Sequence, residues 1–404
     1  MNTVSEYYEA SNLLLTLART AHTESVPLDK AAGRVLAQPL VAPENVPSFD
    51  RSPYDGYALQ ADDVSLATQD CPVTLKITEE IAAGALPSLP VTPGFAAKVL
   101  TGAPIPVGAD AVIMYEETSF TDETVTLYAP VKRGANIVLT GEDIKKGQIL
   151  AEEGTVIDTG LSGTLASLGM AEVQVYQKPL VGIISTGNEV TEVGAPLPAG
   201  GIYNSNRYAI SAALGRIGCD TEYFGTARDD VGHISRLIDL ALSRCDAVVL
   251  TGGVSVGDYD LTPAAMEQSG VDILVNGVNI KPGMACAYGV KEDKLVLGFS
   301  GNPASSVTNL CAVALPAFRK LCGIQQPEHR LFDVVLAEDF NKKSKATRFL
   351  RGSLDLTDGC VKMHISGEQG NVIISSMIGC NVFAIVPAGS DSLKAGTVLK
   401  GFMV

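Results

Sequence analysis

Three glycine-rich turns, each preceded by a short apolar run, constrain the fold of this chain most strongly. Their sequences are STGNE at 185–189, TGGVSVGDYD at 251–260 and FSGNPASS at 299–306. Between residues 178 and 325, apolar strand-like runs alternate with helical patterns, which indicates a doubly wound sheet. The strands of such a sheet end at one crevice, where backbone N–H groups face an anion. We therefore predict an α/β domain that binds a phosphorylated small molecule.

The hydrophobic pattern changes along the chain, which predicts several domains. With 404 residues, the chain is too long for one ordinary hydrophobic core. The predicted domains are a mixed helical and β domain (1–40 with 145–177), a mainly β domain (41–144), the α/β domain (178–325) and a C-terminal β-barrel (326–404). Within the first of these, residues 5–40 are expected to be mostly helical. The predicted fold class is α/β plus β, in a multidomain chain.

Composition excludes several classes of function. The net charge of −15 argues against general nucleic-acid binding, which depends on Lys and Arg. The 8 cysteines form no C-x-x-C pair and there are only 4 histidines, so a zinc site is not expected. The N-terminal residues lack the pattern of a signal peptide, and no apolar run reaches the roughly 18 residues of a membrane span. We expect a cytoplasmic protein that contacts neither nucleic acid nor membrane.

Side chains on the first turn are suited to bind phosphate, although a structural turn with a capping residue would have the same sequence. Thr186 and Gly187 follow an apolar run directly, and Glu189 offers a carboxylate to a metal or a hydroxyl. Farther along, Asp230 in RDD either serves the same crevice or caps the following helix.

The second turn is richer in functional groups than a structural loop requires. It combines glycines that permit close backbone approach with a hydroxyl and two carboxylates, namely Gly252, Gly253, Gly257, Ser255, Asp258 and Asp260. Carboxylates among such glycines indicate a metal between protein and phosphate. The third turn places Gly301, Asn302 and Pro303 at a helix start, where Pro is favoured. Lys281 precedes a Pro-Gly turn and is either an anion ligand or a solvated surface lysine.

Acidic loops also occur in the predicted β domain, far from these turns in sequence. SFDRSPYDGYA contains Asp55, TGAP begins at Thr101, and GEDIKKG contains Asp143. Each loop by itself is typical of a solvated turn. Together they acquire a function if a second subunit presents them to the crevice of the first.

As a set, these motifs resemble the molybdopterin molybdenumtransferase family, which includes the gephyrin E domain. In chain order they are RSPYDGYA, TGAPIPVGADAV, GEDIKKGQ, STGNEV, IYNSN, RDD, TGGVSVGDYD, IKPGMACAYG and SGNPASS, and they extend over almost the whole chain. The resemblance implies an enzyme, a transferase that inserts molybdate into adenylylated molybdopterin and releases AMP, with molybdenum cofactor as the product. It also implies a requirement for Mg²⁺ and an elongated homodimer. In that homodimer the active site is shared between one subunit's α/β molybdopterin-binding domain and the other's β domain.

The resemblance implies roles for individual residues as well. The catalytic set would be Asp55, Glu189, Asp230, Asp258, Asp260 and Lys281, with Glu189, Asp258 and Asp260 as metal ligands. Substrate would be bound by Thr101, Asp143, Thr186, Gly187, Gly252, Gly253, Ser255, Gly257, Gly301, Asn302 and Pro303. Asp55, Thr101 and Asp143 would be presented by the second subunit. Further partners that the resemblance allows for are the adenylyltransferase of the preceding step and proteins of molybdoenzyme maturation.

The chain departs from the commoner family text at three places. Met284-Ala285 stands where Lys-Pro is common, Phe299-Ser300 where Leu-Pro is common, and Asn188 where Asp is common. The missing lysine removes one positive charge near the anion. Alternatives therefore stay open: a non-catalytic or tungstate-preferring paralogue that binds molybdopterin, or a molybdopterin adenylyltransferase, which shares the α/β domain type. The complete carboxylate set and the two extra β domains favour the insertion enzyme.

Overall fold

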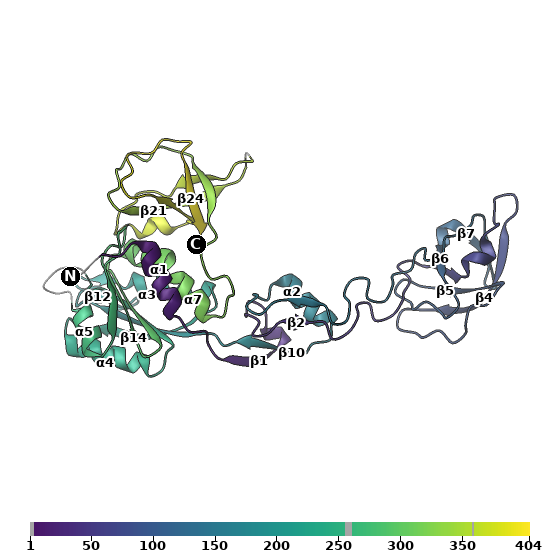
Figure 1. Cartoon of the computed structure of the whole chain (residues 1–404), viewed down its shortest axis with the longest axis horizontal. Helices are drawn as coiled ribbons and strands as arrows, with labels where there is room; N and C mark the ends of the chain where they lie inside the picture. Colours follow the sequence, from purple (N-terminus) through teal and green to yellow (C-terminus); the bar gives the residue numbers. More distant parts are fainter. Residues whose placement is uncertain (1–3, 255–260, 358) are drawn as a thin grey trace. The chain divides into compact units, whose positions relative to one another are not determined.

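The computed structural model describes residues 4–254, 261–357 and 359–404 (Figure 1). Its contacts divide the chain into two compact units. The first unit comprises Met1–Gln38, Glu153–Thr159 and Glu172–Val404, and the second comprises Pro39–Glu152 and Gly160–Ala171. This division does not test where the four predicted domains begin and end, so those boundaries stay predictions.

The central sheet of the first unit has six strands, and it confirms the predicted doubly wound α/β fold. In spatial order the strands are β14 (Asp220–Ala227), β11 (Leu180–Thr186), β15 (Ala247–Thr251), β19 (Lys294–Phe299), β18 (Cys286–Lys291) and β16 (Asp272–Asn276). The first four are parallel, and β18 and β16 add an antiparallel edge. The middle strands are buried on both faces, which explains their continuous apolar sequences.

Helices cover both faces of this sheet. They are α1 (Tyr7–Leu17), α3 (Ser205–Arg216), α4 (Val231–Leu242), α5 (Thr262–Gln268), α6 (Pro303–Asn309) and α7 (Leu315–Leu321), with a π-helical turn at Leu310–Ala314 between the last two. Ile183 and Val249 point into a core shared with α1, α3 and α7, whereas Ile184 and Val248 point into a core shared with α4 and α5. The alternation of side chains along each strand thus builds two cores from one sheet.

The C-terminal part of the first unit is a closed barrel of five strands, as predicted. Its strands are β20 (Phe332–Leu336), β21 (Thr347–Asp355), β22 (Lys362–Ile365), β23 (Val382–Val386) and β24 (Val398–Met403). The pairing of β21 with β23 closes the ring, and the short β17 (Ile280–Lys281) extends it at β21. Val334, Leu350 and Met363 fill its interior.

The expectation that residues 5–40 are mostly helical is wrong beyond Leu17. Thr23–Pro27 is a strand, β1, that pairs antiparallel with β10 (Glu172–Tyr176). Only a single 3₁₀ turn, Leu28–Lys30, follows it. Pro27 and Gly33 break the helical pattern locally, and pairing with a strand distant in sequence decides the rest. A second small pair, β12 (Val190–Thr191) with β13 (Ile202–Tyr203), lies beside the central sheet's first turn.

The second unit is mainly β, as predicted. Its six-stranded sheet has the order β6 (Ala111–Met114), β3 (Gly56–Leu59), β5 (Phe95–Val99), β4 (Val73–Ile81), β8 (Thr124–Leu127) and β7 (Thr118–Phe120). Tyr57, Leu59 and Leu75 belong to its core. Short 3₁₀ turns at Ala61–Val64 and Tyr115–Glu117, the strand pair β2 (Leu40–Val41) with β9 (Ile149–Ala151), and most of α2 (Thr159–Ser167) complete it. Among the described residues of both units, no helix is long and apolar enough to cross a membrane.

Candidate functional site

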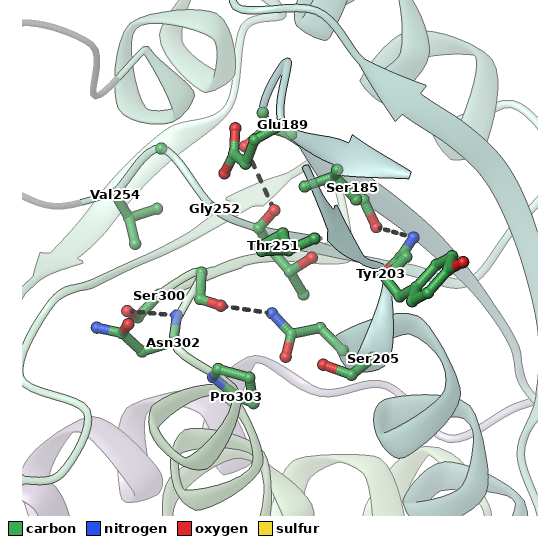
Figure 2. Close-up of a pocket in the computed structure, with 18 of the residues that line it drawn as sticks. Ser185, Glu189, Tyr203, Ser205, Thr251, Gly252, Val254, Ser300, Asn302 and Pro303 are labelled. Atoms are coloured by element: carbon green, nitrogen blue, oxygen red, sulfur yellow. Dashed lines mark hydrogen bonds between the residues drawn. The ribbon is translucent and has the colours of Figure 1, made fainter. Parts of the chain in front are cut away.

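A pocket of about 390 Å³ lies where β11, β15 and β19 end (Figure 2). It is lined by residues of all three glycine-rich turns, among them Glu189, Gly252 and Asn302, and by the first residues of α3. Parallel strands direct their carboxyl ends to the same edge of a sheet, so turns that are more than 100 residues apart in sequence meet here. The structure therefore brings together the predicted residues Thr186, Gly187, Glu189, Gly252, Gly253, Gly301, Asn302 and Pro303.

Glycine is required where the turns approach one another. Gly252 has a φ of +101°, and a Cβ on it would lie 2.5 Å from Oγ1 of Thr186. Gly253 has a φ of +64°, and its Cβ would lie 2.8 Å from Oγ1 of Thr262. Both residues thus need a left-handed backbone and the absence of a side chain.

Only some backbone N–H groups at the pocket are free to bind an anion. The N–H of Gly252 donates to Phe299 O at 2.9 Å, and the N–H of Gly187 donates to Ala227 O at 3.3 Å. The N–H groups of Gly253 and Gly301 have no acceptor among the residues that the structure describes. These two groups, rather than all the glycines, are the available anion ligands.

In the described lining of the pocket, the charged side chains are two carboxylates. Glu189 and Asp229 line it, whereas no Lys, Arg or His of the described lining does so. Asp230, the residue predicted from sequence, instead caps α4, because its Oδ1 accepts from the N–H of His233 at 2.6 Å. The geometry thus favours Asp229 over Asp230 as the pocket carboxylate. When two adjacent Asp residues precede a helix, one of them is expected to cap it. Here the cap is Asp230, which leaves the Asp229 side chain for the pocket.

A hydrogen-bonded network behind the pocket fixes the start of α3. Asn204 donates from Nδ2 to Ser185 Oγ at 2.9 Å and to Glu192 Oε1 at 2.7 Å. The same Glu192 oxygen accepts from the Tyr223 hydroxyl at 2.7 Å, and burial raises the pKa of Tyr223. Sequence reasoning did not select Ser185, Asn204 or Asn206 as site residues. The Asn-Ser-Asn run at a helix start was a signal for Asn204 and Asn206, and the turn STGNE contains Ser185.

Other predicted residues lie away from this pocket or outside the described residues. Lys281 is the last residue of β17, where it lies opposite Arg348 in the strand register with β21. It is exposed and does not line the pocket. Met284, at the position where the resemblance has a lysine, is exposed as well. Ser255, Gly257, Asp258 and Asp260 lie outside the described residues.

Two of the three predicted residues of the second unit contact each other. Asp55 Oδ1 accepts from the backbone N–H of Thr101 at 2.7 Å and from its hydroxyl at 2.8 Å. These two bonds hold the pKa of Asp55 below its usual value. Asp143 is exposed in the turn after residue 140, and its N–H donates to Val46 O at 3.1 Å.

The pocket residues fit a Mg²⁺ ion that is bound together with a phosphorylated ligand. Mg²⁺ prefers oxygen ligands and usually takes only one or two carboxylates, with phosphate oxygens and water completing its shell. Glu189 and Asp229 supply such carboxylates. No cluster of three or more His, Cys, Asp or Glu side chains suited to hold a metal occurs in the described part of the chain, so a metal site made by protein alone is not present there.

Family models match nearly the whole chain. They are described as "MoeA N-terminal region (domain I and II)" at residues 5–169, "Probable molybdopterin binding domain" at 182–320 and "MoeA C-terminal region (domain IV)" at 333–400. A Bacillus subtilis protein named molybdopterin molybdenumtransferase is 34% identical over 98% of this chain and 93% of its own length. A Staphylococcus aureus protein of the same name is 34% identical over 92% of this chain and 89% of its own length. The chain belongs to the molybdopterin molybdenumtransferase family.

Solved structures agree with this membership. A molybdopterin biosynthesis MoeA protein from Pyrococcus horikoshii OT3 superimposes with a TM-score of 0.86 at 31% identity, and covers 100% of both chains. As a member of the molybdopterin molybdenumtransferase family, the chain is a transferase of molybdenum cofactor biosynthesis. The alternatives of a non-catalytic or tungstate-preferring paralogue and of an adenylyltransferase are not favoured, because the relatives match end to end and carry the transferase name.

Proposed function

We propose that the chain inserts molybdate into adenylylated molybdopterin and releases AMP, giving molybdenum cofactor. The observation that carries this proposal is the pocket at the strand ends. The N–H groups of Gly253 and Gly301, which have no acceptor among the described residues, belong to the same pocket lining as Glu189 and Asp229, and that described lining has no basic side chain. Such a pocket binds a phosphate poorly by itself and well together with a divalent cation.

The phosphate groups of the substrate are the part that this pocket is suited to hold. The N–H groups of Gly253 and Gly301 point from two different turns, and the first turn of α3 adds the positive end of a helix 12 residues long. Backbone donors of this kind bind phosphate oxygens without a charged side chain. The adenylate phosphate would therefore be fixed by the main chain, in a position that depends on the three turns remaining together.

Mg²⁺ is the cofactor that we propose, held by one or two carboxylates from the set of Glu189, Asp229 and the sequence-predicted Asp258 and Asp260. When bound, it neutralises phosphate charge and so favours cleavage of the phosphoanhydride bond. In that cleavage water attacks one phosphorus of the anhydride and the P–O bond from that phosphorus to the bridging oxygen breaks. AMP and phosphorylated molybdopterin separate, and the protons released from the water pass to solvent. The residues of the three turns orient this bond, and Asn204 with Glu192 keeps the wall behind them in place.

The molybdate that enters the dithiolene is a substrate, and Lys281 is proposed to bind it. Lys281 is exposed at the end of β17, where a cation can meet an oxyanion from solvent. The neighbouring Met284 contributes no charge, so we expect molybdate binding to depend on Lys281 more strongly than it would with two lysines.

We also propose a homodimer in which Asp55, Thr101 and Asp143 of one protomer complete the pocket of the other. The contact between Asp55 and Thr101 supports this, because a carboxylate already fixed by two hydrogen bonds is a preorganised ligand group. The adenylyltransferase of the preceding step and molybdoenzyme-maturation proteins remain proposed partners. The cytoplasmic location stays a prediction.

The test is AMP release from adenylylated molybdopterin in the presence of Mg²⁺, with molybdate and tungstate titrated in parallel. We expect release that depends on the oxyanion and that is lost in Glu189→Gln. Asn12→Ala, an exposed change on α1, is the control and should retain full release. Folded protein that binds the nucleotide and releases no AMP with either oxyanion would contradict the proposed reaction.

A further inference from the structure

Asn188 and Asp229 form a reciprocal pair of hydrogen bonds across the pocket's edge. The backbone N–H of Asn188 donates to Asp229 Oδ2 at 3.3 Å, and the backbone N–H of Asp229 donates to Asn188 Oδ1 at 3.4 Å. Asn188 belongs to the turn after β11, and Asp229 to the turn after β14. The pair therefore links two strand ends through the side chains of both residues.

A backbone hydrogen bond between the same two turns lies next to the Asn188–Asp229 pair. The N–H of Gly187, one residue before Asn188, donates to Ala227 O at 3.3 Å. Beyond Asp229 the chain turns into α4, whose cap is Asp230. Asp229 is thus the residue between a fixed strand end and a fixed helix start, and the side chain of Asn188 accepts a hydrogen bond from its backbone N–H. The carboxylate of Asp229 is held at the pocket wall by the backbone N–H of Asn188, and the backbone N–H of Asp229 is held by the Asn188 side chain.

The neutrality of Asn188 matters because of the charges around it. Glu189, the next residue, lines the same pocket as Asp229, and the described lining has no basic side chain to offset the two. An amide oxygen at position 188 accepts from the Asp229 N–H without adding charge. A carboxylate in its place could accept the same bond, but it would add a negative charge at the edge of a pocket that receives a phosphate.

We propose that Asn188 is a positioning residue that fixes Asp229 at the pocket wall and sets the balance between cation and phosphate binding there. This inference rests on the proposed function in one respect, namely that the pocket binds a divalent cation together with a phosphorylated ligand. Asn188 is not among the residues that line the pocket. It favours cation binding by positioning Asp229, and it favours phosphate binding because its side chain carries no charge.

Two variants separate these effects. Asn188→Ala removes the acceptor for the Asp229 N–H and keeps the bond from the residue-188 N–H to the Asp229 carboxylate, so the backbone that carries this carboxylate is held less firmly. We expect the Kd for Mn²⁺ to rise by up to about tenfold, as when a residue that orients a metal ligand is removed. Asn188→Asp retains an acceptor and adds charge, so the Kd for Mn²⁺ should stay within about twofold of the unaltered chain or fall. The same variant should weaken AMP binding in the absence of metal, because like charges repel.

The experiment measures Mn²⁺ binding by electron paramagnetic resonance and AMP binding by calorimetry, with and without Mn²⁺, on the full chain. Asn12→Ala and Asn12→Asp make the same changes at an exposed position of α1 and should behave as the unaltered chain. Thermal unfolding of every variant shows whether the fold is retained. A merely structural role for Asn188 would weaken Mn²⁺ binding to a similar extent in both variants.

The outcomes distinguish this inference from the proposed function. If the unaltered chain binds Mn²⁺ and AMP but the two Asn188 variants bind them equally well, the inference is overturned and the proposed function stands. Equal weakening in both variants overturns the inference too. If the unaltered chain binds no Mn²⁺, the proposed cation and this inference fail together. Weaker Mn²⁺ binding in Asn188→Ala alone supports it.

Discussion

Asn206 donates from its side-chain amide to the carbonyl oxygen of Gly301 at 2.9 Å. Asn206 is the second residue of α3, and Gly301 lies in the turn that leads into α6. The Oδ1 of Asn206 is buried and has no partner in the described part of the protein. This one donor therefore joins two walls of the pocket, and it positions the turn that carries the free N–H of Gly301.

Asn206→Ala should weaken nucleotide binding more than it weakens the fold. The loss of one hydrogen bond costs about 1 kcal/mol, which corresponds to a roughly fivefold increase in the Kd for AMP if the Gly301 turn is held less firmly. Calorimetric titration of AMP in the presence of Mg²⁺ measures this. Asn12→Ala serves as the control, and an unchanged Kd in Asn206→Ala would show that the turn is held by its other contacts.

Substitutions of Asp229 and Asp230 should have different effects, one on cation binding and the other on the free energy of unfolding. Asp230→Ala removes the cap of α4 and is expected to lower the free energy of unfolding by about 1 kcal/mol, while leaving Mn²⁺ binding unchanged. Asp229→Ala removes a pocket carboxylate and is expected to do the reverse. Chemical denaturation and Mn²⁺ titration of both variants measure the two quantities. The opposite pattern would restore Asp230 as the pocket residue.

Much of the fold could be predicted because its signals are local in sequence. The central residues of β15 and β19 are apolar since both faces of these strands are buried, and glycine-rich turns follow the strands at the expected places. The helical expectation for residues 5–40 was wrong because β1 owes its conformation to β10, almost 150 residues away, and no local pattern contains that partner. Pairing over such distances overrides the intrinsic preference of a segment.

The pocket was harder to predict than the fold, because roles within it depend on hydrogen-bond direction. The sequence identifies Gly252 and Gly253 alike as phosphate-binding glycines, yet the N–H of Gly252 donates to Phe299 O, whereas that of Gly253 has no acceptor among the described residues. Asp229 and Asp230 are equivalent in sequence, and only the position of the helix start distinguishes them. Identity and spacing give the candidates at such a site, whereas three-dimensional contacts assign their functions.

Gly252→Ala should destabilise the chain far more than alanine at another left-handed glycine. A Cβ at Gly252 would lie 2.5 Å from Thr186 Oγ1 and 2.7 Å from Thr186 O, so the turns would have to separate. Gly270, with a φ of +77° and no atom within 4 Å of its Cβ, is the matched control. We expect a loss of about 1 kcal/mol for Gly270→Ala from backbone strain alone, and roughly 3 kcal/mol or more for Gly252→Ala. Equal losses in urea denaturation would show that the turns can move apart without cost.

His329 should make the stability of the first unit depend on pH. Its ring stacks on Phe402 with a centroid distance of 3.9 Å, and its Nε2 is buried with no partner among the residues described. Burial, reinforced by the positive charge of Arg319, lowers the pKa of His329 from 6.5 to about 4. Between these two values the unfolded chain binds a proton that the folded chain does not, so stability rises with pH there. It is fully present above pH 6.5 and is lost as the pH falls toward 4.

His329→Phe tests this dependence, because it retains a stacking ring and removes the titrating group. From pH 7 to pH 4, the unaltered chain should lose roughly 3 kcal/mol of unfolding free energy more than the variant. Carboxylates titrate in both chains, so the difference between their two pH profiles isolates the imidazole. Urea denaturation at pH steps of half a unit measures it, and parallel profiles would mean that His329 is protonated in the folded chain without cost. A difference in unfolding free energy that develops only below pH 6.5 is the expected result. It would identify the buried His329 ring as a group whose protonation destabilises the folded chain in acid.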